Sequence, residues 1–303
     1  MLHPQAKEFL DQVAQMDPPA WESLPVEEAR KRFADLTPMY GLVQPVRRVE
    51  DLEVAGVSCR SYAPECDSVI GTLVYFHGGG WVIGDLSTHD ALCRNLSNQL
   101  HVNVISVDYA LSPEHRFPFA LDQCHEVVKA IANDSSLAGF DSLPLVVGGD
   151  SAGGNLAAMT ALRDRDESSR VIAAQILIYP VIEPIFDSSS YEEFADGFGL
   201  TRDNMRYFWD CYLGSGAKPA QAAASSASSH DNLPPAIVLT AGADVLRDEG
   251  ERYARILSDS GVAMSFRRFE GMIHGFVHLA SIFNESANEA NQWIAEELRK
   301  HLT

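Results

Sequence analysis

Residues 145–154 read Leu-Val-Val-Gly-Gly-Asp-Ser-Ala-Gly-Gly, a short apolar run that leads directly into the pattern Gly-x-Ser-x-Gly. A buried strand over Leu145–Val147 and a helix from Ala152 would place Ser151 on the sharp turn between them. The flanking glycines avoid clashes at such a bend, and a helix start favours negative charge beside the serine. A plain glycine turn with Ser151 as the helix N-cap is the alternative. The strand before and the helix after favour a nucleophilic serine.

Apolar runs of strand length recur on both sides of this motif. They are Thr72–Phe76, Val102–Val107, Ala174–Ile178, Ala236–Leu239 and Met264–Phe269. Helical periodicity is found at His89–Leu100, Phe119–Ile131, Ala152–Leu162, Asp248–Leu257 and Asn288–Leu302. Buried strands that alternate with helices form a mostly parallel sheet covered on both faces, so an α/β protein is predicted. Two antiparallel strands are predicted between Val46 and Ala63, with the turn near Gly56.

Two segments fall outside this alternation. Residues 1–45 contain the helix-like stretches His3–Gln15 and Pro25–Ala34. Residues 183–230 contain no strand candidate, one helix-like stretch at Thr201–Tyr212, and an Ala- and Ser-rich end. An insertion such as residues 183–230, between two strands at the functional edge of a sheet, is typical of a lid. The prediction is a catalytic domain of residues 46–182 and 231–303, a cap insertion of residues 183–230, and N-terminal helices that contribute to the cap.

A run of three glycines follows the strand candidate Thr72–Phe76, in the sequence His-Gly-Gly-Gly-Trp at residues 77–81. Consecutive glycines let backbone N–H groups approach a ligand closely, and acyl transfer needs such donors to stabilise an oxyanion. A flexible turn with a surface histidine is the alternative. The predicted oxyanion hole consists of the N–H groups of Gly79, Gly80 and Ala152. The residues predicted to shape the loop, or to hold the elbow by hydrogen bonds, are His77, Gly78 and Asp150.

A nucleophilic serine in this context needs a base and an orienting acid, which follow it in the order acid, then histidine. The downstream histidines are His230, His274, His278 and His301. His274 lies in the glycine-flanked stretch 271–276, directly after the strand Met264–Phe269. Loops at the carboxyl ends of strands are where sites form in α/β sheets. His274 is therefore the predicted base, and a structural loop histidine is the alternative.

Two aspartates compete for the role of the acid. Asp248 begins a helix and has Glu251 three residues later, which is a capping pattern with Asp in place of Ser or Thr. Asp244 lies in the loop after the strand Ala236–Leu239 and has no such structural explanation. Asp244 is therefore the predicted acid.

Charge and cysteine content exclude several classes of protein. The formal net charge of −19 argues against nucleic acid and anionic membrane partners. It favours solubility and leaves adaptation to salt open. No segment is long and apolar enough to span a membrane, and the first residues do not resemble a signal peptide. The five cysteines form no C-x-x-C pair, which indicates neither a metal site nor a redox dithiol, and a cytoplasmic protein is predicted.

Four motifs together resemble those of the bacterial hormone-sensitive-lipase-like esterases: HGGGW at 77–81, GDSAGG at 149–154, DVLRDE at 244–249 and HGF at 274–276. The resemblance covers the whole chain. Residues 108–118 are similar to the family's D-Y-R-L-A-P-E-H-x-F-P, except that Ala110 and Ser112 replace Arg and Ala. This departure puts a local charge interaction in doubt and not the chemistry.

The resemblance implies an α/β-hydrolase fold with a helical cap. It implies a carboxylesterase that hydrolyses short- to medium-chain acyl esters through a Ser-His-Asp triad and an acyl-enzyme, without a cofactor. Many members of the family dimerise through an edge strand, which here would be Met264–Phe269.

Two other functions stay open at this point. A catalytically inactive small-molecule receptor would share the fold, but the intact Ser151, Asp244 and His274 argue against it. A peptidase or amidase would share the chemistry, and the chain has no propeller-sized extra domain that could gate peptides. Fold alone does not exclude the second function.

Overall fold

Within residues 1–302, the part that this computed structural model describes, the strands form one eight-stranded sheet in the order β1-β2-β4-β3-β5-β6-β7-β8. The strands are β1 (Arg48–Val54), β2 (Val57–Ala63), β3 (Gly71–Phe76), β4 (Val102–Val107), β5 (Leu145–Asp150), β6 (Ile172–Ile178), β7 (Ala236–Ala243) and β8 (Met264–Ile273). Strands β3 to β8 pair in parallel, while β2 is antiparallel to both of its neighbours. The predicted mostly parallel sheet and its antiparallel start are confirmed.

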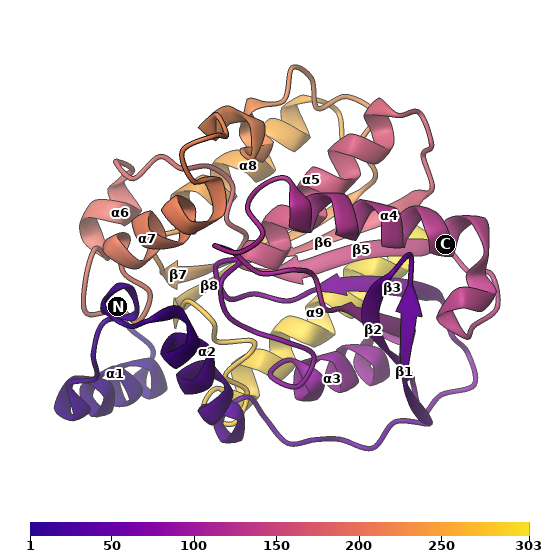
Figure 1. Cartoon of the computed structure of the whole chain (residues 1–303). Coiled ribbons are helices and arrows are strands. Elements are labelled where there is room, and N and C mark those ends of the chain that lie inside the picture. The colour runs from indigo at the N-terminus through magenta and orange to yellow at the C-terminus, as the bar shows by residue number, and fades with distance from the viewer. Residues whose placement is uncertain (303) are drawn as a thin grey trace.

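Helices cover both faces of this sheet. Figure 1 shows α3 (Asp90–Leu100) and α9 (Asn284–Leu302) on one face, and α4 (Phe119–Asn133), α5 (Ala152–Asp166) and α8 (Arg247–Asp259) on the other. Every residue of β3, β4, β5 and β7 is buried. This explains why these strands are almost continuously apolar instead of alternating.

Two strands continue further than the sequence pattern predicted. β5 extends through Asp150, because Gly149 and Asp150 continue the ladder with β6. β8 extends to Ile273, which pairs with Ala243 after an irregularity in the β7 ladder. The prediction that residues 271–273 belong to a loop is therefore wrong, because the pairing with β7 continues to Ile273 although Gly271 has a φ of 74°.

The remaining α-helices gather at the end of the sheet to which the parallel strands point (Figure 1). They are α1 (Pro4–Met16), α2 (Val26–Asp35), α6 (Ser189–Glu193) and α7 (Arg202–Leu213). The Asn204 amide of α7 donates to Glu22 Oε2 at 2.6 Å, which joins the excursion to the N-terminal segment. The five-residue α6 was not predicted, since so short a helix shows no periodicity. The division into catalytic domain and cap stays a prediction.

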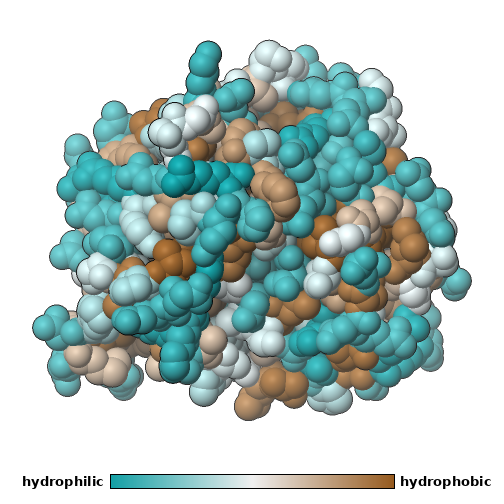
Figure 2. Space-filling view, viewed as in Figure 1, coloured by the Kyte–Doolittle hydropathy of each residue, from teal (hydrophilic) through white to brown (hydrophobic). Residues whose placement is uncertain are grey.

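Hydrophilic side chains cover most of the face shown in Figure 2, with smaller apolar patches between them. This agrees with the net charge of −19. Among the helices within residues 1–302, none has the length and hydropathy needed to cross a bilayer.

Candidate active site

Ser151 lies on a strained turn between β5 and α5. Its backbone has a φ of 56° and a ψ of −119°, which is rare for a residue other than glycine. The turn is tight, since a Cβ on Gly153 would collide with the carbonyl oxygen of Phe76. Although Ser151 occupies the N-cap position of α5, its side chain does not cap the helix. Ser151 Oγ instead lies 3.0 Å from His274 Nε2, so the N-cap alternative is wrong.

His274 joins Ser151 to Asp244. His274 Nδ1 lies 2.7 Å from Asp244 Oδ2, and the other Asp244 oxygen accepts the N–H of Leu246 at 3.0 Å. The Asp244 side chain is fully buried. A carboxylate beside Nδ1 favours a proton on that nitrogen, which leaves the Nε2 lone pair directed at the serine hydroxyl. Ser151, Asp244 and His274 follow β5, β7 and β8, whose carboxyl ends meet at one edge of the sheet.

Two of the competing histidines, His278 and His230, bind backbone carbonyl oxygens away from Ser151. His278 is buried, and its Nε2–H donates to the Thr88 carbonyl oxygen at 2.8 Å. His230 Nε2 donates to the Ala224 carbonyl oxygen at 2.9 Å. His301 lies in α9.

The capping role predicted for Asp248 is wrong. Helix α8 begins at Arg247, so Asp248 is already its second residue. Asp248 Oδ2 accepts the N–H of Ser190 at 2.8 Å, and Glu251 pairs with Arg268 at 2.6 Å. Asp248 therefore links α8 to α6, a contact that no local pattern reveals.

The glycine loop lies between the elbow and the cap. Gly80 has a φ of 59°, and a Cβ there would collide with the ring of Phe208 on α7. The ring of Trp81 stacks on Tyr212 of the same helix, with centroids 4.2 Å apart. Ala152 is the first residue of α5, so its N–H has no acceptor within the helix. The Ala152 N–H is thus a free backbone donor next to Ser151, and the glycine loop packs against the apolar side chains of α7.

Asp150, which precedes Ser151, connects the glycine loop to the turn that carries the serine. Its buried Oδ1 accepts the Gly78 N–H at 2.9 Å and the Tyr75 hydroxyl at 2.7 Å. His89 Nε2 lies 3.5 Å from the same oxygen. Burial acts in the opposite direction, yet His89, His278 and Tyr75 together hold the pKa of Asp150 below its ordinary value. His89 was not predicted, since nothing in its local sequence points toward Asp150.

His77 has a structural environment. Its Nδ1–H donates to the Gly78 carbonyl oxygen at 2.8 Å, and its ring stacks on Tyr109. Burial lowers the pKa of His77 to about 4. The imidazole is therefore neutral near pH 7 and shapes the loop.

The departures at residues 110 and 112 lie beside the glycine loop. The Ser112 N–H donates to the Trp81 carbonyl oxygen at 2.8 Å. Arg30 of α2 donates to the Ser112 carbonyl oxygen at 3.1 Å and pairs with Glu114 at 2.7 Å. The Ala110 N–H donates to the Gln123 side chain at 2.7 Å. An arginine from the N-terminal helices thus supplies a positive charge to this segment.

Two further buried residues near the site were not predicted. The ring of Tyr179 lies 4.7 Å from the His274 ring, and its backbone has a φ of 34°. Glu249 is buried in the first turn of α8, where Oε1 accepts the N–H of Ile182 at 2.6 Å. The sequence places Tyr179 before a proline and Glu249 in a helical first turn, so both have ordinary local explanations.

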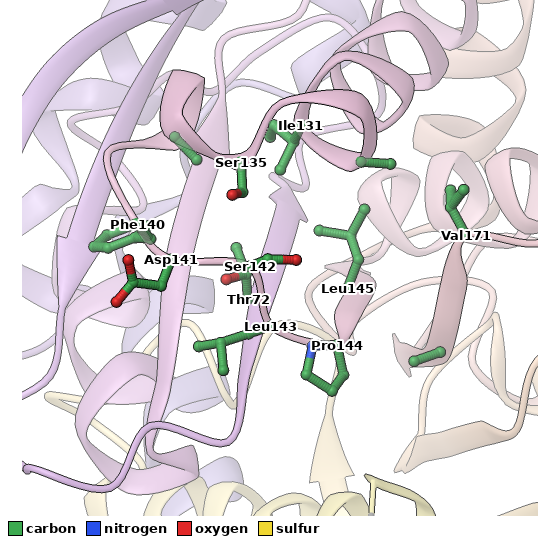
Figure 3. Close-up of a pocket in the computed structure, with 13 residues that line it drawn as sticks. Thr72, Ile131, Ser135, Phe140, Asp141, Ser142, Leu143, Pro144, Leu145 and Val171 are labelled. Atoms are coloured by element: carbon green, nitrogen blue, oxygen red, sulfur yellow. The ribbon is translucent and has the colours of Figure 1, made fainter.

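Figure 3 shows a pocket that lies away from Ser151 and has a volume of about 220 Å³; its lining includes residues at the amino ends of the parallel strands, whereas Ser151 follows a carboxyl end. Thr72 and Leu145, near the amino ends of β3 and β5, contribute to its lining. Within the described residues 1–302, no group of three or more His, Cys, Asp or Glu side chains is arranged to hold a metal ion.

Comparisons with known proteins point to the same chemistry. Residues 73–278 match the model of a family described as having the α/β hydrolase fold. The chain is 38% identical over 268 residues to the carboxylic ester hydrolase LipN of Mycobacterium tuberculosis, covering 84% of this chain and 71% of that protein. It is 33% identical over 294 residues to the ethyl acetate hydrolase of Pseudomonas putida, covering 92% of each.

A solved structure is similar to this chain over almost its whole length. An ester hydrolase from the metagenome of Lake Arreo, complexed with a bipyridine phosphonate derivative, superposes with a TM-score of 0.94. It is 34% identical and covers 99% of both chains.

Proposed function

Because the chain belongs to the hormone-sensitive-lipase-like esterases of the α/β hydrolase fold family and is a serine carboxylesterase, we propose that it hydrolyses short- to medium-chain acyl esters through Ser151, His274 and Asp244. The hydrogen-bonded line from Asp244 through His274 to Ser151 Oγ is the observation that supports this assignment.

The proposed reaction begins when His274 Nε2 takes the proton of Ser151 Oγ, which attacks the ester carbonyl carbon. The N–H groups of Gly79, Gly80 and Ala152 stabilise the oxyanion of the tetrahedral intermediate. Collapse of the intermediate expels the alcohol, which His274 protonates. His274 then takes a proton from water, whose oxygen attacks the carbonyl carbon of the acyl-enzyme. The bond to Ser151 Oγ breaks, His274 returns its proton to Oγ, and the carboxylic acid is released. Asp244 orients the imidazole and stabilises the imidazolium throughout.

The proposed cap consists of residues 1–45 and 183–230, and the contact of Phe208 with the glycine loop supports it. A proposed homodimer would form through Met264–Phe269. The position of β8 at the edge of the sheet and the half-exposed Phe266 support that proposal.

Acyl chain length tests the proposed substrate class. Buried methylenes contribute about 0.8 kcal/mol each until the space under α7 is filled, after which they must stay hydrated or displace the cap. We expect kcat/KM on nitrophenyl esters to rise from acetate to butyrate or hexanoate and to fall sharply beyond octanoate. A series up to palmitate measures this, with Ser151→Ala as the background control. A maximum at palmitate would contradict the closed site and indicate a lipase.

Asp150 provides a test of the glycine loop. In Asp150→Ala, the Gly78 N–H and the Tyr75 hydroxyl lose their acceptor, which should loosen the oxyanion donors. We expect a loss of about 10²-fold to 10³-fold in kcat, as for a lost oxyanion donor, with little change in KM. Steady-state kinetics on nitrophenyl butyrate measure both constants. Asp166→Ala, at the exposed end of α5, is the matched control, and equal kcat in the two variants would remove Asp150 from this role.

A further inference from the structure

Residues 178–183, between the end of β6 and the cap excursion, contact the backbone on both sides of Ser151. The Ser151 N–H donates to the Ile178 carbonyl oxygen at 2.9 Å, and the Val181 N–H donates to the Ser151 carbonyl oxygen at 3.0 Å. Tyr179 lies between these two bonds, with its ring against His274. The strained φ of Ser151 is therefore held on both sides by this one segment.

The same segment is fixed at its other end by Glu249. Glu249 Oε1 accepts the Ile182 N–H at 2.6 Å and lies 3.4 Å from the Glu183 nitrogen. Glu249 stands five residues after Asp244 on one continuous turn, where the Gly250 N–H donates to the Leu246 carbonyl oxygen at 3.1 Å. The carboxyl group of Glu249 thus joins the turn that carries Asp244 to the segment that holds Ser151.

A second set of bonds joins the same turn to α6. The Ser190 hydroxyl donates to the Val245 carbonyl oxygen at 2.7 Å, and Asp248 accepts the Ser190 N–H. These bonds join Val245 and Asp248 to α6 and do not reach residues 178–183. Two side chains of α8 reach residues 182 and 183. Arg252 pairs with the Glu183 carboxylate, whereas Glu249 accepts the backbone N–H groups of Ile182 and Glu183, next to the residues that hold Ser151.

We propose that Glu249 is a positioning residue, which sets the distance between Ser151 and the Asp244–His274 pair by fixing residues 178–183 to the Asp244 turn. The inference rests on the proposed function, since it concerns the geometry of that reaction. Glu249 does not touch the substrate and acts through the backbone of Val181 and Ile182.

The protonation state of Glu249 suits this role. Burial, and then the nearby Asp244 carboxylate, raise the pKa of Glu249 well above its ordinary value. The Tyr191 hydroxyl of α6 is the other titratable group beside this carboxyl. The folded protein therefore keeps Glu249 protonated to a higher pH than a free glutamate, and a glutamine has almost the same shape as that neutral form.

Three variants test the inference: Glu249→Ala, Glu249→Gln and the control Glu251→Ala, which removes a surface ion pair from the same helix. Misplacing the reacting groups by about 1 Å costs about 10²-fold, so Glu249→Ala should lose about that factor in kcat on nitrophenyl butyrate. KM should change little. The glutamine amide oxygen accepts the same N–H, so Glu249→Gln should keep kcat within about threefold of wild type. The phosphonylation rate of Ser151 by a nitrophenyl phosphonate should follow the same order.

Stability gives a separate readout. Because the pKa of Glu249 is higher in the folded protein, folding favours the protonated side chain. The contribution of Glu249 to the free energy of unfolding is therefore complete below the ordinary pKa of 4.5 and is lost as the pH rises toward the folded pKa. The Tm of Glu249→Gln should therefore increase relative to wild type as the pH rises above the ordinary pKa of 4.5. A difference in Tm that decreases as the pH rises from there would contradict a raised pKa of Glu249.

The outcomes separate the two proposals. If wild type does not hydrolyse nitrophenyl butyrate, the proposed function fails, whatever Glu249 does. If wild type is active and folded Glu249→Ala keeps its kcat and phosphonylation rate, Glu249 is only structural and the inference is overturned. Equal losses in Glu249→Gln and Glu249→Ala would overturn it as well. Should the alanine variant not fold, Glu249→Asp, which retracts the carboxyl group by one methylene, replaces it in the same comparison.

Discussion

The Ser151→Ala protein is expected to fold normally and to lose about 10⁵-fold to 10⁶-fold in kcat, because the nucleophile and its base act as a unit. Alanine removes only Oγ, which lies 3.0 Å from His274 Nε2 and makes no capping bond to α5. The measurement is steady-state hydrolysis of nitrophenyl butyrate, together with the Tm and the circular dichroism spectrum.

Ser188→Ala is the control for this experiment, since Ser188 lies in the cap excursion and its hydroxyl contacts only that of Ser190 among described side chains. It should keep nearly full activity. If Ser151→Ala retains more than about a hundredth of wild-type kcat, Ser151 is not the nucleophile, because a triad nucleophile contributes far more than that.

Asp244→Asn should lose about 10⁴-fold in kcat, the cost seen when a triad carboxylate becomes an amide. The asparagine side chain can present an N–H to His274 Nδ1, which favours the tautomer with its proton on Nε2. That proton would face Ser151 Oγ, and the imidazole could no longer accept the serine proton. A pH series of kcat/KM in the variant and wild type measures the effect.

Asp248→Asn is the matched comparison, because Asp248 lies four residues further along the same turn. Asparagine keeps one acceptor oxygen, so the variant should lose one of the bonds to Ser190 and Arg247 and the charge on the other, about 1 kcal/mol of stability, and keep most of its kcat. An inactive Asp248→Asn beside an active Asp244→Asn would show that the acid has been assigned to the wrong residue.

Local sequence patterns predict the sheet and the residues at strand ends, because both depend on short-range signals. The strand–Ser–helix context around residues 145–166 and the glycines after β3 contain enough information to locate the site. The length of a strand is harder to predict. The glycine at position 271 indicates a loop, yet pairing with β7 extends β8 through this residue to Ile273. Tertiary pairing overrides the local preference there.

Local sequence patterns do not predict hydrogen bonds between residues that are far apart in the sequence. Asp248 looks like a helix cap, but its partner Ser190 is 58 residues away. Glu249 looks like an ordinary first-turn acid, and its bond to Ile182 spans 67 residues. Helical periodicity does not indicate that Asp248 contacts Ser190 or that Glu249 contacts Ile182, so these contacts are seen only in the structure.

The backbone of Ser151 has a consequence for how such a protein adapts to heat. A residue held at a φ of 56° costs about 1–3 kcal/mol, while a whole domain is stable by only about 5–15 kcal/mol. Glycine would relax this turn but could not attack an ester, so selection for thermostability has no route through position 151. A more heat-resistant form of this protein must therefore gain its stability elsewhere, in surface ion pairs, shorter loops or better packed helices.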